Sequence, residues 1–293
     1  MNILVCGASG FVGRHLTRAL VKAGHTVRRG VRNPSQPHDI AMDFLTDAQK
    51  DIWLPRLDGI SVVINAVGVL RDHPQRPMSS LHVETPKALF SACAESGVER
   101  IIQLSALGVD RGIDTPYFNA RLAAEAYLHS MPDSIRRLVL RPSLIYGHDG
   151  ASAKMFRFMS RMPVHVLPAG GTQRLQPVHI DDLCDAAVRW LRDPHTQNQT
   201  IAAVGAEATT LRGMLDSYRE QNEHTPAAHI SVPARLMRLA ARIGDAIPSS
   251  PLCSDTLSML AAGNAADSAG FAGLLGRQPQ SFRQFISQAH SNG

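Results

Sequence analysis

Three glycines close to the N-terminus have the spacing of a phosphate-binding turn. Gly7, Gly10 and Gly13 follow a short apolar run, residues 2–6, of the kind that forms a strand buried on both faces. In such a turn the first glycine permits the bend, the second lets the backbone approach a pyrophosphate, and the third allows close helix packing. Free N–H groups at the start of the following helix then point at the phosphates. The pattern predicts a dinucleotide site, against the simpler alternative of an ordinary glycine turn.

Arginines occupy the second expected strand, residues 26–31, beside which the adenosine ribose would lie. This strand and the two residues after it contain no acidic residue but hold Arg28, Arg29 and Arg32. Sites selective for NAD place Asp or Glu here, whereas a 2′-phosphate needs cationic donors. We therefore predict NADP(H) in preference to NAD(H), with Arg32 as the main phosphate ligand and Arg28 or Arg29 assisting. The alternative is that these arginines are solvated at the sheet edge.

Strand-like and helical segments alternate as far as Gly147, which is typical of a doubly wound parallel sheet. Up to that point the expected strands are residues 2–6, 26–31, 39–44, 60–66, 100–105 and 134–141, and the expected helices are 12–23, 46–54, 81–96 and 118–131. After Gly147 the segments are shorter, and the regular alternation of strands and helices ends. The sequence thus predicts an α/β fold: a Rossmann-type doubly wound parallel sheet in residues 1–147. A smaller, partly helical C-terminal lobe should follow in residues 148–293, with some chain returning to the sheet.

Six segments, in order and spacing, carry a resemblance to a known family. They are GASGFVGRHL at 7–16, INAVG at 64–68, RIIQLSALGVD at 100–110, YFNAR at 117–121, RPSLIYG at 141–147 and PVHIDDLCDA at 177–186. The chain resembles an atypical, extended short-chain dehydrogenase/reductase (SDR). Within that group it looks most like the NADPH-binding accessory subunit of respiratory complex I and its bacterial relatives.

The resemblance implies which residues contact the dinucleotide. They are Gly7, Ser9, Gly10, Phe11, Val12, Gly13, Arg28, Arg32, Asp43, Ala66, Val67, Gly68, Ser105, Tyr117, Arg121, Pro142 and Ile145. Some of these positions follow expected strands, at the carboxyl edge where doubly wound sheets bind ligands.

The catalytic set of an SDR is a serine, a tyrosine and a lysine, and this chain keeps one of the three. Tyr117 matches the tyrosine that moves a proton, while Arg121 stands at the lysine position, where arginine is not a neutral replacement. Leu107 falls at the serine position if the spacing of extended SDRs holds, and Ser105 then lines the cofactor pocket. In the simpler alternatives, Tyr117 is a half-buried helix tyrosine and Arg121 is a solvated helix arginine, and neither has a catalytic role.

Two functions follow from this altered set. The favoured one is an NADP(H)-binding protein whose cofactor is structural or sensory, as a subunit linked to respiratory or quinone metabolism. The other is an active NADP(H)-dependent oxidoreductase, or an NAD-dependent epimerase/dehydratase-type enzyme, that uses Tyr117 as its acid/base group with Arg121 as partner.

The composition argues against several other classes of protein. A net charge of +5 with arginines scattered along the chain does not indicate nucleic-acid binding. The four cysteines lie in apolar contexts without paired spacing, and the histidines show no helical ligand spacing, so we expect no disulfide and no metal site. We expect no signal peptide and no transmembrane segment. These features predict a cytoplasmic protein, with attachment to the inner membrane as an option.

That option rests on an expected helix at residues 233–247. Leu236, Leu239, Ala240, Ile243 and Ile247 share one face, and Arg235, Arg238 and Arg242 share another. A basic amphipathic helix can rest on an anionic membrane or on an acidic protein partner. In the ordinary alternative, the apolar face packs on the C-terminal lobe and the arginines are solvated.

Overall fold

The structure is a computed structural model that describes residues 1–73, 75–247, 250 and 252–287. It divides into two compact units. The first holds Met1–Arg141 with Cys184–Ile201, and the second holds Pro142–Leu183 with the described residues from Ala202 onward. Each unit is described below by itself.

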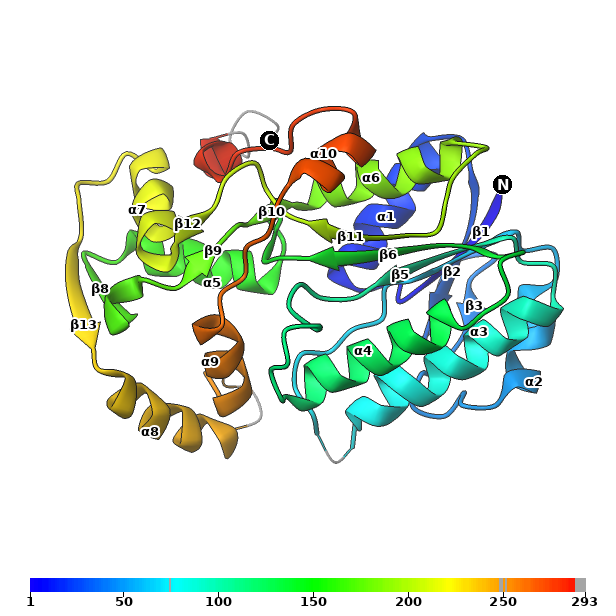
Figure 1. The fold of residues 1–293 in the computed structure, drawn as a ribbon, viewed down its shortest axis with the longest axis horizontal. Coiled ribbons are helices and arrows are strands. Elements are labelled where there is room, and N and C mark those ends of the chain that lie inside the picture. Colours follow the sequence, from blue (N-terminus) through cyan, green and yellow to red (C-terminus); the bar gives the residue numbers. More distant parts are fainter. Residues whose placement is uncertain (74, 248–249, 251, 288–293) are drawn as a thin grey trace. The chain divides into compact units, whose positions relative to one another are not determined.

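A seven-stranded sheet organises the first unit (Figure 1), in the order β11-β6-β5-β4-β1-β2-β3. Its strands are β1 (Asn2–Cys6), β2 (Thr26–Val31), β3 (Ile40–Ala41), β4 (Val62–Asn65), β5 (Arg100–Leu104), β6 (Arg136–Pro142) and β11 (Gln199–Ala203). The pairings from β3 through to β6 are parallel. The strand order moves outward in both directions from β1, as in a doubly wound sheet, so the predicted α/β Rossmann-type fold is confirmed.

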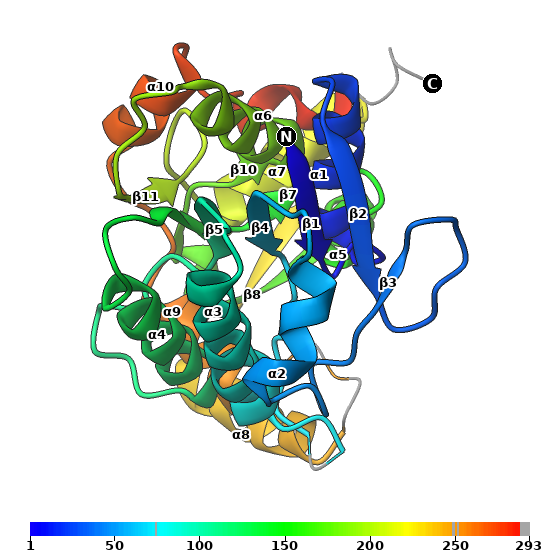
Figure 2. The same ribbon diagram turned by 90° about the vertical axis from the view of Figure 1, so that its right-hand side faces the viewer.

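Helices cover both faces of this sheet, with α1 and α6 on one face and α2, α3 and α4 on the other (Figures 1 and 2). Their bounds are α1 (Phe11–Lys22), α2 (Lys50–Trp53), α3 (Thr85–Glu95), α4 (Pro116–His129) and α6 (Ile180–Arg192). Because successive strand side chains point to opposite faces, Leu4 and Cys6 of β1 join the core that includes Leu89 and Phe90 of α3. All four cysteines are buried, and they form no disulfide with one another.

The segment between β2 and α2 differs from its predicted form. Strand β3 contains two residues rather than six, and α2 begins after Gln49 rather than at residue 46. Two aspartates explain the difference, because Asp43 Oδ1 accepts from the Leu45 N–H at 3.0 Å and Asp47 Oδ2 accepts from the Asp43 N–H at 2.7 Å. Such local side-chain bonds to the backbone compete with regular structure.

The second unit is built from three two-stranded ribbons and short helices. The ribbons pair β7 (Ile145–Tyr146) with β10 (Val178–His179), β9 (Arg174–Leu175) with β12 (Thr209–Thr210), and β8 (Val164–Pro168) with β13 (Ala228–Val232). The helices are α5 (Ala151–Arg161), α7 (Leu211–Gln221), α8 (Ala234–Asp245), α9 (Ser254–Ala261) and α10 (Ala269–Leu275). Its core packs Tyr146 and Leu167 against Leu215 and Phe285. Helices α9 and α10 were not predicted, since their short, small-residue sequences show little periodicity.

Candidate dinucleotide site

The glycine turn between β1 and α1 disfavours side chains at two positions, at one through its backbone angle and at the other through lack of space. Gly7 has φ +77°, and its N–H donates to the Gly30 carbonyl of β2 at 3.0 Å. A Cβ on Gly13 would lie 2.1 Å from the Gly7 carbonyl oxygen, which is closer than any real contact. Gly13 therefore lets α1 pack directly against the turn, as the spacing predicted.

The first turn of α1 is open to solvent. Gly10 is the N-cap, and no side chain caps the helix. Ser9 and Gly10 are exposed, while Phe11 and Val12 are partly exposed. Because the first N–H groups of a helix have no intrahelical acceptor, this turn can donate to an anionic group.

The three arginines at β2 have different surroundings. Arg28 donates from Nη1 to the Asp58 carbonyl at 3.4 Å, and Arg29 Nε lies 3.5 Å from Asp39 Oδ1. Arg32 is exposed, and no acceptor for its guanidinium is found in the part of the chain that the structure describes. Of the three arginines, Arg32 is therefore the one whose guanidinium is available to bind an anion.

The ends of β4 and β5 are joined by buried amides. Asn65 Nδ2 donates to Gln103 Oε1 at 2.9 Å, and Asn65 Oδ1 accepts from the Val67 N–H at 3.2 Å. This fixes the loop through Ala66, Val67 and Gly68, whose exposure increases toward Gly68.

Arg121 binds the same two strand ends from α4. Its side chain is buried, with Nη1 donating to the Leu104 carbonyl at 2.8 Å and Nη2 to the Val67 carbonyl at 3.3 Å. A Cβ on Gly68 would lie 2.6 Å from Arg121 Nη2, so the loop backbone packs closely on the guanidinium. The arginine is thus a buried clamp between β4 and β5, and the alternative of a solvated helix arginine is wrong.

Tyr117 lies at the start of α4, beside Arg121. Thr115 caps the helix by accepting from the Phe118 N–H at 3.2 Å, and Pro116 occupies the first turn. The Arg121 guanidinium lies 5.3 Å from the centroid of the partly exposed Tyr117 ring. This is within the range of a cation–π contact.

His82 completes the group and was not predicted. Its ring meets Tyr117 edge to face with centroids 5.8 Å apart, and its Nε2 lies 3.0 Å from the Val69 carbonyl oxygen. Burial, and then the positive charge of Arg121, lower the pKa of His82 to about 3, so the imidazole is neutral near pH 7. Sequence spacing gave no signal for it, since only the tertiary fold brings it to Tyr117.

The remaining predicted positions are distributed over both units. Ser105 and Leu107 are buried, and Ser105 Oγ has no hydrogen-bond partner among the described residues. Asp43 is partly exposed in the loop after β3. Pro142 and Ile145 belong to the second unit, where Ile145 pairs with Val178.

The amphipathic helix of the second unit has an exposed apolar face. Leu236, Leu239 and Ile243 of α8 are 57–62% exposed, and Ile247 after it is also exposed. The buried positions of α8 are Ala241 and Gly244, on a different side of the helix. The alternative in which the large apolar side chains pack on the lobe is therefore wrong for these residues.

Comparison with known proteins places the chain in a family. Residues 3–205 match the NAD dependent epimerase/dehydratase family. The chain belongs to this family of extended SDR proteins, which confirms the resemblance seen in the six sequence segments.

Curated relatives are similar over part of their length. The chain is 29% identical over 202 residues to a ceramide reductase of Caulobacter vibrioides, covering 66% of this chain and 61% of that protein. It is 30% identical over 204 residues to subunit 9 of the NADH dehydrogenase [ubiquinone] 1 alpha subcomplex of Arabidopsis thaliana, covering 64% of this chain and 50% of that protein. The matched region is thus between half and about three fifths of these relatives.

Solved structures share the fold over the whole chain. The human epimerase family protein SDR39U1 with NADPH gives a TM-score of 0.77 at 19% identity, covering 100% of both chains. The quinone oxidoreductase QOR2 of Escherichia coli with NADPH gives 0.75 at 17% identity, covering 99% of this chain and 100% of that one. At these identities the likeness extends to the fold alone.

Proposed function

We propose that this chain binds NADP(H) as a structural or sensory cofactor, in a subunit linked to respiratory or quinone metabolism, without efficient turnover. The observation that carries the proposal is Arg121. At the position where an active SDR holds lysine, its guanidinium is buried and donates to the Leu104 and Val67 carbonyls.

This arrangement removes two contributions to catalysis. A lysine at this position would have to reach the ribose and act on the tyrosine, whereas the guanidinium of Arg121 is already bonded to two strand ends. Leu107, at the position of the catalytic serine, has no hydroxyl with which to orient a substrate. General acid–base catalysis contributes roughly a hundred- to ten-thousandfold in rate, and it needs a positioned substrate.

The cofactor is proposed to lie across the glycine turn, with its 2′-phosphate at Arg32. Arg28 and Arg29 have partners in Asp58 and Asp39, which supports our assignment of the phosphate-binding role to Arg32. Two structural neighbours were solved with NADPH, which supports the proposed cofactor. Relatives that are subunits of NADH dehydrogenase support the proposed link to respiratory metabolism.

An active reductase is the second candidate. It is favoured by the partly exposed Tyr117 ring and by relatives named as reductases, including the Caulobacter ceramide reductase and a maize dihydroflavonol 4-reductase. In that case Tyr117 would move the proton, while neutral His82 and cationic Arg121 would surround its ring.

Two measurements separate the candidates. Native mass spectrometry of the purified chain should show co-purified NADP(H). Turnover with carbonyl and nucleotide-sugar substrates should be absent or weak, and Tyr117→Phe should bind NADPH as the wild type does. Turnover in the ordinary enzyme range, about 1–1,000 per second, that is lost in Tyr117→Phe would overturn the structural or sensory role.

We also propose that α8 attaches the second unit to an anionic membrane surface. The exposed apolar face of Leu236, Leu239 and Ile243 suits the acyl boundary, and the exposed Arg235 and Arg238 suit anionic headgroups. Such cations contribute about 1 kcal/mol each near an anionic surface. No helix among the described residues is long and apolar enough to span a bilayer, so this contact would be peripheral.

Flotation with phosphatidylglycerol vesicles at low salt tests the attachment. The wild type should float, Leu239→Asp should float far less, and Val21→Asp, at an exposed apolar residue of α1, should behave as the wild type. Absence of wild-type flotation, or equal loss in both variants, would overturn it. Binding to an acidic protein in place of vesicles would do the same.

A further inference from the structure

Two histidines face each other across a strand pair in the second unit. Strands β8 and β13 are parallel, and His165 is in register with His229. Along β8 the side chains alternate, so that His165 and Leu167 are buried while Val164 and Val166 are exposed. The two imidazoles therefore lie on the inner face of the ribbon, with their ring centroids 5.4 Å apart.

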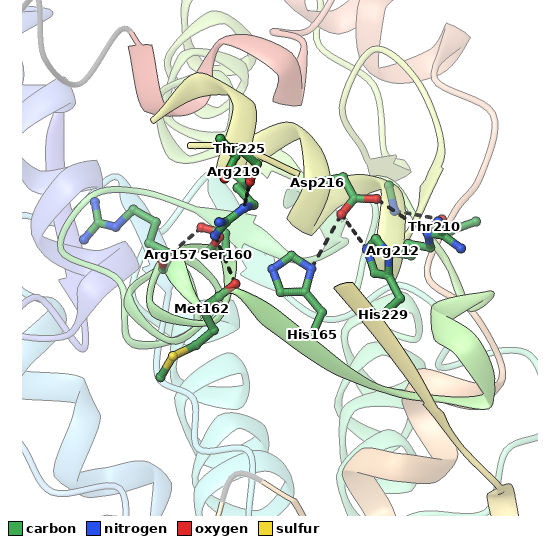
Figure 3. Close-up of polar contacts among 11 residues, drawn as sticks. Arg157, Ser160, Met162, His165, Thr210, Arg212, Asp216, Arg219, Thr225 and His229 are labelled. Carbon is green, nitrogen blue, oxygen red and sulfur yellow. Dashed lines mark hydrogen bonds and ion pairs between the residues drawn. The ribbon is translucent and has the colours of Figure 1, made fainter. Parts of the chain in front are cut away.

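Helix α7 supplies a carboxylate to this pair (Figure 3). Asp216 Oδ1 lies 2.7 Å from His229 Nε2 and 3.5 Å from His165 Nδ1. One nitrogen from each histidine and one oxygen of the aspartate all lie within 4.8 Å of one another. Two imidazole nitrogens and one carboxylate oxygen thus converge from three distant segments of the chain.

His165 is the most deeply buried member of the group, and its Nδ1 has a long contact to Asp216 Oδ1 at 3.5 Å. Its side chain is 1% exposed, and neither ring nitrogen has a hydrogen-bond partner among the described residues. An unpaired buried polar group costs about 1–3 kcal/mol. Burial also lowers the pKa of His165, which favours the neutral imidazole that binds metals.

We propose that His165, His229 and Asp216 bind a divalent transition-metal ion of the zinc class. Nitrogen and carboxylate ligands suit Zn²⁺, whereas Mg²⁺ and Ca²⁺ prefer oxygen alone. Ligands about 2.0–2.2 Å from a tetrahedral ion lie roughly 3.3 Å apart, so the observed separations of Asp216 Oδ1 from the two histidines require only small shifts. Asp216 is 40% exposed, which gives the ion a route from solvent and leaves a coordination position for water.

Two arginines of α7 face the same group, and each has a defined partner. Arg212 Nε lies 3.6 Å from Asp216 Oδ2, so it holds the second carboxylate oxygen and leaves Oδ1 for the ion. Arg219 is buried and donates to the carbonyls of Ser160, Met162 and Thr225 (Figure 3). Their charges lower the affinity of the site without occupying its ligand atoms.

The sequence predicted no metal site because its histidines lack helical ligand spacing. This cluster does not depend on such spacing, since its ligands come from β8, α7 and β13 and meet only through strand register. The proposal also does not depend on the dinucleotide, because none of the three residues is assigned to it.

Calorimetric titration of the full chain with Zn²⁺ tests the proposal, and visible absorption of bound Co²⁺ reports the geometry. The wild type should bind one equivalent. Loss of a group that merely orients a ligand costs about 10–100-fold in affinity, so His229→Gln and Asp216→Asn should each lose at least about 100-fold. His224→Gln, at an exposed histidine of the same unit, should bind as the wild type does.

The test uses variants of the two partly exposed ligands, because these substitutions are expected to leave the unit folded. His165→Gln alters a buried side chain and can unfold the unit, whereas His229 and Asp216 are partly exposed, and circular dichroism verifies the fold of their variants. Failure of the wild type to bind Zn²⁺, or equal affinity in the two ligand variants and the wild type, would overturn the proposal and leave an ordinary histidine–aspartate ion pair.

Discussion

His82 in the first unit and His165 in the second are both almost fully buried, but they differ in what meets their ring nitrogens. His82 Nε2 lies 3.0 Å from the Val69 carbonyl oxygen and its ring packs on Tyr117. His165 has no hydrogen-bond partner for either nitrogen in the described chain. The first histidine is accounted for by the fold, and for the second we propose that a bound ion satisfies the ring.

The same contrast extends to the surroundings of each histidine. Around His82, the Arg121 guanidinium bonds two strand-end carbonyls, and the neighbouring turn leaves no space at Gly13. Around His165, the ligand atoms of Asp216 and His229 converge on a partly exposed point. In the first region the guanidinium donates to backbone carbonyls from two strand ends, whereas in the second region the nitrogen and oxygen atoms of three side chains converge on one point.

The largest expected effect is at the glycine turn of the first unit. In Gly13→Ala, the new Cβ would lie 2.1 Å from the Gly7 carbonyl oxygen, and backbone cannot yield as a flexible side chain can. We expect a loss of about 3 kcal/mol in the free energy of unfolding, with loss of NADPH binding. Denaturant unfolding followed by tryptophan fluorescence reports on this unit, since both tryptophans, Trp53 and Trp190, are buried in it.

A matched glycine in the second unit provides the control. Gly273 lies inside α10, and a Cβ added there would meet nothing within 4 Å, so Gly273→Ala should be neutral or slightly stabilising. Because both tryptophans lie in the first unit, unfolding of both glycine variants is also followed by circular dichroism. Equal losses in both glycine variants would mean that the turn at Gly13 is not specially constrained.

Arg121→Ala should have the next largest effect. It removes the donor from the Leu104 and Val67 carbonyls, and a buried unsatisfied carbonyl costs about 1–3 kcal/mol. We expect a loss of about 2–3 kcal/mol, again measured by tryptophan fluorescence. Arg136→Ala, at an exposed arginine at the start of β6, is the control and should change little. Retention of wild-type stability in Arg121→Ala would contradict the clamp and weaken the proposed function.

The pH dependence of stability tests the state of His82. Burial, then the charge of Arg121, lower its pKa to about 3 in the folded protein, against 6.5 ordinarily. Between these values the unfolded chain binds a proton that the folded chain does not, so stability falls as the pH falls from 6.5 toward 3. The slope is about 1.4 kcal/mol per pH unit.

Substituting His82 should remove this slope from the first unit. His82→Gln is expected to flatten the fall in stability between pH 6.5 and 4.5, whereas His195→Gln, at an exposed histidine of the same unit, should keep it. An unchanged slope in His82→Gln would show that His82 is protonated in the folded protein near pH 6, contrary to its burial.

Local sequence patterns predicted the strands, helices and glycine turn of the first unit. They did not predict the side-chain contacts that form only when distant segments meet in the folded chain. Alternating strands and helices predicted the parallel sheet, and the glycine spacing predicted a turn in which Gly13 has no room for a side chain. The burial of Arg121 was not predictable, because a helix arginine can equally be solvated. His82 and His165 likewise depend on contacts between distant segments, which periodicity does not encode.

The smallest expected effect concerns cofactor choice at the edge of the first unit. Arg32 is exposed and uncommitted, whereas Arg28 and Arg29 have partners, so the 2′-phosphate should depend on Arg32. A charge-assisted hydrogen bond contributes about 1.5–3 kcal/mol, so Arg32→Ala should weaken NADPH about tenfold or more. NADH, which lacks the phosphate, should bind nearly as before, and Arg136→Ala should affect neither nucleotide. Titration of both nucleotides decides the matter, because equal wild-type affinities, or an equal loss of both in Arg32→Ala, would defeat the assignment of NADP(H).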